Sequence, residues 1–448
     1  MRLAKRWLKT TLIASVASVL ALTAAGCGSS GTTDKGATGS TSGTTAPANN
    51  AKKEPVTLSI MYNWSSPNVD NGIYKDRIKK FMADNPDIKI EEESVPSEQY
   101  RTKLRTLAAG KKLPDMFILF PGVDMDPLVS GGVLMPIDDI MDTWKGMLPE
   151  DAIAGFKVNG KQYAIPTKQT FVDIVYYNKE LLAKVGYTEF PKTYADLLEL
   201  IKKLKAAGIT PLALGNKDRW PLQSSWMSAI ADRFTGSDFL YKVNKGEAKY
   251  TDPEFVKALG VIEEFAKLDA FNPDMNTMDV VQVQDYFMQG KAAIHITSST
   301  IDAKFRHENP KGDNIGIALF PAVEGGKGDP KKSASAVQYG IGLNSQLEGA
   351  KKEAAQKFLK YFYSKELYQT LLSKGIVVPA RVEMPADANK YLREMIELTN
   401  KGTSPVFDAV ALIPVKDVIE NGLQAITTKQ KTAEQVAKEM QAAQEKAK

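Results

Sequence analysis

The chain has 448 residues, which is too long for one ordinary hydrophobic core and suits two domains. Its 58 basic and 53 acidic residues give a net charge of +5, and four of the basic residues lie within residues 1–26, so the remainder is almost neutral. No tract combines Lys and Arg with interleaved aromatic residues, which excludes a nucleic-acid-binding protein. A single cysteine excludes an intramolecular disulfide.

The amino terminus has the pattern of a secretory signal peptide over residues 1–26. Basic residues precede an apolar run, 12–25, which is shorter than the roughly 20 residues of a membrane-spanning helix. The only cysteine, Cys27, follows directly, and this junction resembles a bacterial lipobox, although Ala24 stands where that pattern more often has leucine. The alternatives are an amphipathic helix here, or a secreted chain with a free thiol. Residues 27–54 are predicted to be the lipidated cysteine and a flexible linker rich in Gly, Ser and Thr.

The next part of the chain alternates between β-rich and amphipathic segments, as in a parallel sheet covered by helices. We expect strands over 56–62, 88–90 and 115–120, with helices around 73–82 and 100–109. Two of these strands lead into loops, at Asn63-Trp64-Ser65 and at residues 121–124. Open α/β sheets bind ligands at the carboxyl ends of their strands, so these loops are candidate binding elements.

The segment 158–223 continues this pattern, with strands expected over 161–166, 171–177 and 211–214. Thr193 is placed to cap a helix, and Gly208 is placed for a left-handed C-cap. Trp220 follows the last of these strands. Because an indole ring packs on the C–H face of a sugar, Trp220 is a candidate ligand platform. Trp144 and Trp226 are expected to be packing residues.

The remaining elements are helices and strands of ordinary length. Helices are expected around 224–233, 253–268, 280–288 and 353–363, then from Ser364 and from Asn389, with strands over 292–296 and 315–320. The strand over 292–296 ends in four hydroxyl side chains, residues 297–300.

Sequence signals for an enzyme are absent. No metal-binding His spacing, C-x-x-C pair, Walker A loop, G-x-G-x-x-G or G-x-S-x-G pattern occurs, so no cofactor and no metal is expected. His295 lies inside a predicted strand, where a structural role is expected. A glycosidase needs only two carboxylates, which cannot be recognised among 53 acidic residues, so that class stays open.

Several short motifs, in this order and spacing, resemble the extracellular solute-binding proteins of carbohydrate ABC importers, the family that includes maltose-binding protein. They are G-K-x-Y-A-I-P (160–166), Y-Y-N-K (176–179), P-K-T-Y (191–194), G-I-T-P-L (208–212) and R-W-P (219–221), with L-P-D-M-F (113–117), F-M-Q-G-K-A-A-I (287–294) and G-I-G-L-N-S (340–345). The resemblance covers the chain from about Val56 onward.

This resemblance implies a two-lobed periplasmic-binding-protein-like α/β fold, in which each lobe is a mainly parallel sheet flanked by helices and the lobes are joined by hinge crossings. The first crossing is expected within 166–170, and the return near Gln338 and Tyr339. Lobe one would comprise residues 55–167 and 338–388, and lobe two residues 168–337 and 389–448.

Carried over position by position, the resemblance implies a ligand cleft formed by Asn63, Trp64, Ser65, Phe120, Gly122, Asp124, Trp220, Ser298, Ser299, Tyr339 and Arg381. The sequence departs from maltose-binding protein in the second loop, where Leu119 and Gly122 replace a tryptophan and an aspartate. Thr300 likewise stands where the family has an aromatic residue. These departures imply a different sugar.

The implied function is capture of a carbohydrate, with an oligosaccharide favoured, by hinge closure and its delivery to ABC permease subunits in the membrane. The protein is expected to be a monomer, located outside the cytoplasm and anchored to the cell membrane through Cys27. The alternatives are a binding protein for another polar solute, such as a polyol or glycerol phosphate, and a surface glycosidase.

We predict that Cys27 becomes the acylated amino-terminal residue, because the charged and apolar run ends at Gly26-Cys27. Two or more acyl chains would anchor the protein stably, whereas one would be marginal. Mass spectrometry of the protein from its native membrane should find lipid on Cys27. An intact signal peptide, or an unmodified chain cut elsewhere, would refute this prediction.

Overall fold

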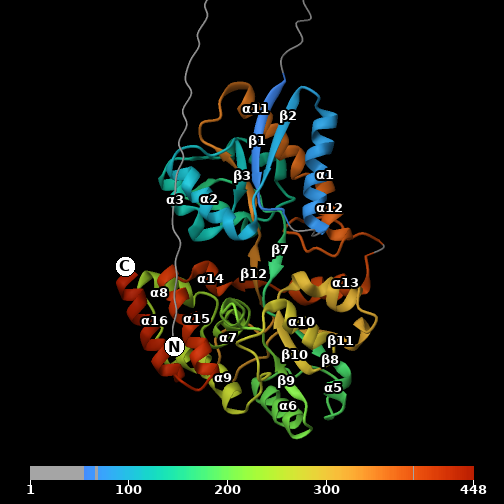
Figure 1. Ribbon diagram of the computed structural model, residues 1–448, viewed down its shortest axis with the longest axis vertical. Helices are drawn as coiled ribbons and strands as arrows, with labels where there is room; N and C mark the ends of the chain where they lie inside the picture. Colours follow the sequence, from blue (N-terminus) through green and yellow to red (C-terminus); the bar gives the residue numbers. More distant parts are fainter. Residues whose placement is uncertain (1–54, 66–68, 387, 448) are drawn as a thin grey trace, which may run out of the picture. The chain divides into compact units, whose positions relative to one another are not determined.

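In the computed structural model, which describes residues 55–65, 69–386 and 388–447, the first sheet has the strand order β2-β1-β3-β13-β4 (Figure 1). Parallel pairing joins β1 (Val56–Tyr62) to β2 (Ile88–Ser94) and β3 (Met116–Leu119). Antiparallel pairing joins β13 (Gly340–Asn344) to β3 and to β4 (Leu134–Met135). The signal peptide, Cys27 and the linker lie outside the described residues.

The second sheet has the order β11-β8-β10-β9. In it, β8 (Ile174–Asn178) runs antiparallel to β10 (Ala292–Thr297) and β11 (Ile315–Ala318), and β10 runs parallel to β9 (Thr210–Ala213). Each sheet therefore has a single reversed strand, β13 in the first and β8 in the second. Both follow a crossing of the chain, which enters each sheet at the end where the other strands leave it.

A third, three-stranded sheet, β14-β12-β7, connects the two larger ones (Figure 1). Here β12 (Ser333–Val337) runs antiparallel to β7 (Gln169–Phe171) and parallel to β14 (Thr403–Pro405). The single strand expected over 171–177 is therefore wrong, because Val172 and Asp173 separate β7 from β8. The strand expected over 161–166 is also shorter, since β6 (Lys161–Gln162) forms a small hairpin with β5 (Lys157–Val158).

Helices cover both larger sheets. The first sheet packs against α1 (Val69–Asp84), α2 (Ser97–Ala109), α3 (Asp126–Ser130), α4 (Glu150–Ile153), α11 (Gly349–Phe362) and α12 (Lys365–Ser373). The second packs against α5 (Lys179–Ala183), α6 (Tyr194–Ala206), α7 (Met227–Thr235), α8 (Phe239–Lys245), α9 (Pro253–Lys267), α10 (Val280–Met288), α14 (Phe407–Val410), α15 (Ile413–Thr427) and α16 (Ala433–Ala447). The helix α13 (Lys390–Thr399) contributes Leu392 to the first core and Met395 to a smaller cluster beside the second sheet.

Short 3-10 and π turns complete the chain. The 3-10 turns are η1 (Gly122–Asp124), η2 (Asp138–Trp144), η3 (Ala154–Phe156), η5 (Ser299–Ile301) and η7 (Gly312–Asn314), and the π turns are η4 (Leu222–Trp226) and η6 (Ala303–His307). Within the described residues, no helix is both long and apolar enough to cross a membrane.

Local signals in the sequence were accurate where side chains bond to their own backbone. The Thr193 hydroxyl accepts a hydrogen bond from the Asp196 amide at 3.2 Å and caps α6, as expected. Gly208 has φ of +71°, the left-handed conformation expected after this helix. Trp144 and Trp226 are buried in the two cores, as expected.

Two buried polar clamps hold the connecting strands β7 and β12 together, one at each end. Near the first sheet, the Thr167 amide and hydroxyl both donate to the Tyr339 carbonyl, at 3.2 and 2.9 Å. Near the second sheet, the Asp173 carboxylate accepts from the Ser333 hydroxyl at 2.5 Å and from the Ala334 amide at 2.9 Å. The residues between the clamps form a ladder of only three opposed pairs, which we call the hinge ladder.

Burial raises the pKa of Asp173 to about 6, against the hydrogen bonds from Ala334 and Ser333 that lower it. The folded protein therefore binds this proton more tightly than the unfolded chain, whose Asp pKa is about 3.9. The stability that Asp173 contributes is present below about pH 4 and is lost as the pH rises towards 6.

We predict that Asp173→Asn removes this loss, because the amide keeps an acceptor for Ala334 and adds no charge. Relative to wild type, the variant should gain about 2 to 3 kcal/mol between pH 4 and pH 7. Urea unfolding midpoints of both proteins at pH 4, 5.5 and 7 measure this, since other acids titrate equally in each. Parallel pH profiles would contradict the prediction.

Candidate functional site

The end of β1 was expected to supply three ligand contacts, and the structure separates them. Trp64 is fully buried, with its ring 4.6 Å from Tyr62 and 6.1 Å from Phe362 between centroids, both in stacked orientation. A ring without exposed surface offers no face to a sugar, so in this arrangement Trp64 is a packing residue. Ser65 is exposed. The half-buried Asn63 has an Oδ1 atom that is covered and bonds to no described residue.

The loop after β3 places Phe120 and Asp124 on either side of one cation. The guanidinium carbon of Arg101, from α2, lies 4.2 Å from the centre of the Phe120 ring, and its Nε lies 3.4 Å from Asp124 Oδ2. The ring edge of Phe120 meets Tyr339 with 6.3 Å between centroids. Arg101 therefore covers one face of Phe120, and a ligand would have to use what remains.

Gly122 and Tyr339 lie close to the hinge ladder. Gly122 has φ of +78°, and a Cβ atom there would stand 3.4 Å from the Ala409 carbonyl of α14, so this turn brings the first lobe's loop against the second lobe. Tyr339 is almost fully buried, and burial raises the pKa of its hydroxyl. Tyr339 also touches the rings of Trp64 and Tyr74, so it joins the hinge to the first core.

Trp220 is the one candidate aromatic with a large free surface, since 41% of it is exposed. It follows β9, and its neighbour Arg219 has φ of +65°, a strained value for a residue other than glycine. Arg219 Nη1 donates to Asn421 Oδ1 of α15 at 2.7 Å, which holds the turn in place. The second lobe thus keeps an indole in solvent by a local backbone strain.

Gln223 is a candidate that the sequence did not reveal. It lies in the π turn η4, just after Trp220, and it is buried with Nε2 bonded to no described residue. Buried unpaired polar groups are rare and π turns are frequent at functional sites. The apolar periodicity of this segment predicted an ordinary helix and could not show the extra residue in the turn.

The hydroxyl groups after β10 bond within the protein in this structure. The Ser298 hydroxyl accepts from the Thr300 amide at 3.2 Å, and the Ser299 hydroxyl accepts from the Phe171 amide at 3.2 Å. Ser299 therefore fastens η5 to the outer edge of β7. Each hydroxyl keeps further hydrogen-bonding capacity.

Arg381 is exposed and lies between α12 and α13, where its amide donates to the Met147 carbonyl at 2.7 Å. None of the described contacts joins Arg381 to the other predicted site residues.

Two charged groups near these loops were also missed by the sequence analysis. Lys168, in the first crossing, forms a mostly buried ion pair with Asp70 in the first turn of α1. In the second lobe, burial raises the pKa of Glu420, as do Asp417 and Asp408, while Arg219 opposes the shift. Their partners are distant in sequence, so no local pattern indicates either group.

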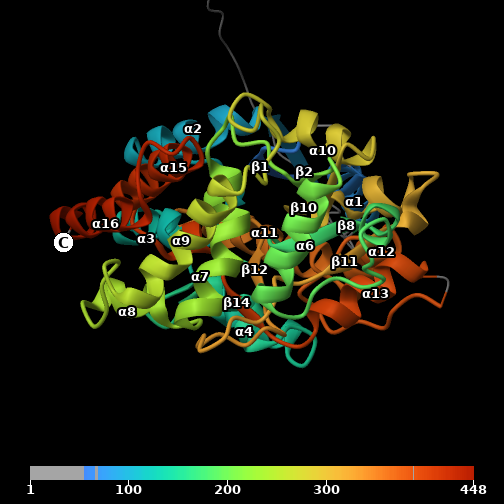
Figure 2. The ribbon, with the colours of Figure 1, turned by 90° about the horizontal axis from the view of Figure 1, so that it is seen from below.

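The predicted residues lie mainly on one side of the hinge ladder. Figure 2 shows α2, α10 and α15 towards one edge of the view, and α4 and β14 towards the opposite edge, with β12 between them. Phe120 and Asp124 are tied through Arg101 to α2, and Trp220 is tied through Arg219 to α15. The structure therefore brings Phe120, Asp124 and Trp220 to the same side of the hinge.

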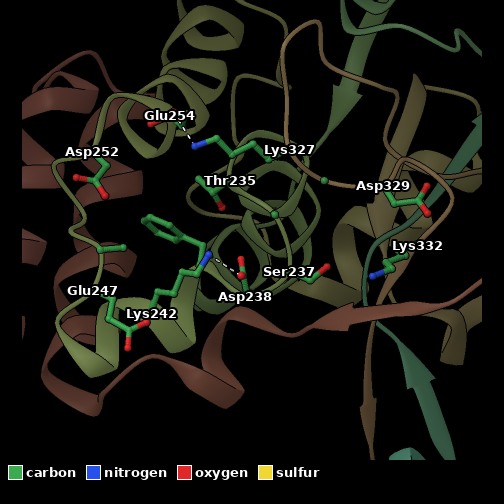
Figure 3. A pocket seen from close by; sticks show the side chains of 14 residues that line it. Thr235, Ser237, Asp238, Lys242, Glu247, Asp252, Glu254, Lys327, Asp329 and Lys332 are labelled. Carbon is green, nitrogen blue, oxygen red and sulfur yellow. Dashed lines mark hydrogen bonds and ion pairs between the residues drawn. The ribbon is translucent and has the colours of Figure 1, made fainter.

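A cavity of about 690 Å³ elsewhere in the second lobe contains none of the predicted residues. Its charged side chains pair with one another, Lys327 with Glu254 at 2.8 Å and Lys242 with Asp238 at 2.6 Å (Figure 3). Within the described ranges, no group of three or more His, Cys, Asp or Glu side chains is placed to hold a metal ion. His295 is buried in β10 and bonds through Nδ1 to the Ala213 carbonyl at 2.9 Å, and burial lowers its pKa to about 4.

Known proteins share this architecture and sequence. A multiple sugar-binding protein of Streptococcus mutans is 24% identical over 327 residues, covering 70% of this chain and 72% of its own. An ABC transporter extracellular-binding protein of Pyrococcus horikoshii is 26% identical over 358 residues, covering 78% of this chain and 77% of its own. The solved structure of a chitin oligosaccharide binding protein superimposes with a TM-score of 0.78 at 27% identity, covering 88% of this chain and 99% of that one.

The two-lobed fold expected from the sequence is confirmed by this likeness. The sequence model described as bacterial extracellular solute-binding protein matches residues 65–369, more than half of the chain. This chain belongs to the bacterial extracellular solute-binding protein family.

Proposed function

We propose that this protein captures an oligosaccharide outside the cytoplasm and delivers it to an ABC permease. The observation that carries the proposal is the exposed Trp220, held by a strained turn on the same side of the hinge as the Phe120–Asp124 loop of the other lobe. An aromatic face with polar groups around it is the usual arrangement for binding a sugar ring. The sugar-binding relatives support the same ligand class.

Ligand capture would proceed by closure of two lobes, residues 55–167 with 338–388 and residues 168–337 with 389–448. A ligand that touches both lobes binds the closed state more tightly, and this difference in affinity is what shifts the equilibrium. The hinge ladder is short and is clamped at both ends by Thr167 and Asp173, so rotation would concentrate in the few residues between them.

Each lobe would contribute different chemistry. Trp220 would pack on a sugar ring, while the unpaired amides of Asn63 and Gln223 would bond to hydroxyl groups after small side-chain movements. Asp124, Ser65, Ser298 and Arg381 would form the polar rim. A phosphorylated solute is less favoured, because Lys168 is already paired with Asp70 and Arg101 with Asp124.

The chain would bind its ligand without turnover and act as a monomer, attached to the membrane through acylated Cys27. The linker over 28–54 is rich in Gly, Ser and Thr, a composition that gives flexible chains and would let the lobes reach the permease.

A thermal-shift screen of mono- and oligosaccharides, polyols and glycerol phosphate tests the ligand class. The matching oligosaccharide at 100 times its dissociation constant should add about 2.7 kcal/mol of stability. Long incubation with the protein should return that glycan unchanged. Stabilisation by polyols or phosphates alone would point to the other solute class, and released products would make the protein a glycosidase.

Two tryptophan variants should separate ligand contact from packing. Trp220→Ala should weaken sugar binding by about 1.5 to 3 kcal/mol, or roughly ten- to a hundredfold, with little change in melting temperature. Trp64→Ala should cost about 3 to 5 kcal/mol of folding stability, because it empties a core site. Calorimetric titration and thermal melts measure both quantities. A large loss of stability with unchanged affinity in Trp220→Ala would remove Trp220 from the site.

A further inference from the structure

The hinge ladder has two faces, and the register assigns its residues to them. Gln169 pairs with Val337, and Thr170 pairs with Ala336. Directly opposed residues share a face, and successive residues alternate between faces. Gln169 and Val337 therefore lie on one face, and Thr170 and Ala336 on the other.

A cavity of about 750 Å³ lies against the face that carries Gln169, Ser335 and Val337. Its other walls come from α4 and η3 on the first-sheet side, and from α8, β14 and α14 on the second-sheet side. In Figure 2, α4 and β14 lie on the side of β12 away from α15, to which Trp220 is tied. We call this space the hinge-back cavity, because Trp220 and the Phe120–Asp124 loop lie on the opposite side.

Small residues keep the hinge-back cavity open. Ala154 lines it from the first lobe and Ala409 from the second, and both are exposed. Beside them the lobes are already in contact. A Cβ atom on Gly155 would stand 3.3 Å from Val337 Cγ2, and one on Gly122 would stand 3.4 Å from the Ala409 carbonyl. Larger side chains in this cavity would therefore press on the opposite wall.

We propose that the residues lining the hinge-back cavity, above all Ala154 and Ala409, set the affinity for the ligand without touching it. This inference rests on the proposed function, because it assumes that closure binds the ligand. Two rigid lobes that rotate about a short ladder narrow one side when the other widens. A side chain that holds the hinge-back cavity open therefore favours closure on the Trp220 side.

The effect on affinity follows from the population of the closed state. If closed molecules are a small fraction without ligand, the apparent dissociation constant is the intrinsic one divided by that fraction. A wedge that raises the closed fraction about tenfold should lower the dissociation constant about tenfold. The small size of Ala154 and Ala409 would thus hold the free protein open.

The experiment uses Ala154→Trp and Ala409→Trp in the full chain, one variant from each wall. Ala442→Trp, on the exposed surface of α16, is the matched control. Small-angle X-ray scattering without ligand should show a smaller radius of gyration for both wedge variants than for wild type and control. Titration with the glycan found by the thermal screen should show binding about tenfold tighter, and thermal melts should report intact folding.

Unchanged scattering and unchanged affinity in folded wedge variants would overturn the proposal, as would weaker binding. If either tryptophan prevented folding, Ala154→Leu and Ala409→Leu would provide the same test with a smaller wedge. The scattering measurement needs no ligand. A wild-type protein that binds no glycan would therefore count against the proposed function, while the scattering result would still decide whether the cavity controls closure.

Discussion

The antiparallel pairing of β7 with β12 is the constraint on which the rest of this molecule depends. Two cores, each built on its own sheet, meet through strands of three and five residues. Thr167 fixes the ladder to the first sheet, and Asp173 fixes it to the second, each with two hydrogen bonds. Because these bonds are buried, they compete little with water, and bending is left to the residues between them.

The reversed strands have the same origin. A chain that crosses the hinge must enter the next sheet at the end where its other strands finish, so β8 and β13 run against their neighbours. This topology places the strand ends of both sheets next to the hinge. Loops that follow those ends, including the turns at Phe120 and Trp220, are therefore carried on rigid elements and moved by one short ladder.

Aromatic residues show how differently the same side chain can be used. Trp64 and Trp220 both follow a strand near the hinge, yet Trp64 lies inside a cluster with Tyr62, Tyr74 and Phe362, and Trp220 stands in solvent. Burial of Trp64 gains hydrophobic stabilisation, whereas exposure of Trp220 gives up that gain and is accompanied by a strained Arg219. Strain and unpaired polar groups such as Gln223 are tolerated where a ligand completes the site.

The sequence by itself determined the family, the two-lobed fold and the local structure around caps and turns, because ordered motifs and side chains such as Thr193 act over a few residues. It also indicated Trp220, since position after a strand is a local property. Only the tertiary structure decided that Trp64 is buried, that one strand breaks at Asp173, and that Arg101 covers Phe120. Those outcomes depend on α1, α11, β12 and α2, whose contacts with these residues come from distant parts of the chain and leave no local pattern.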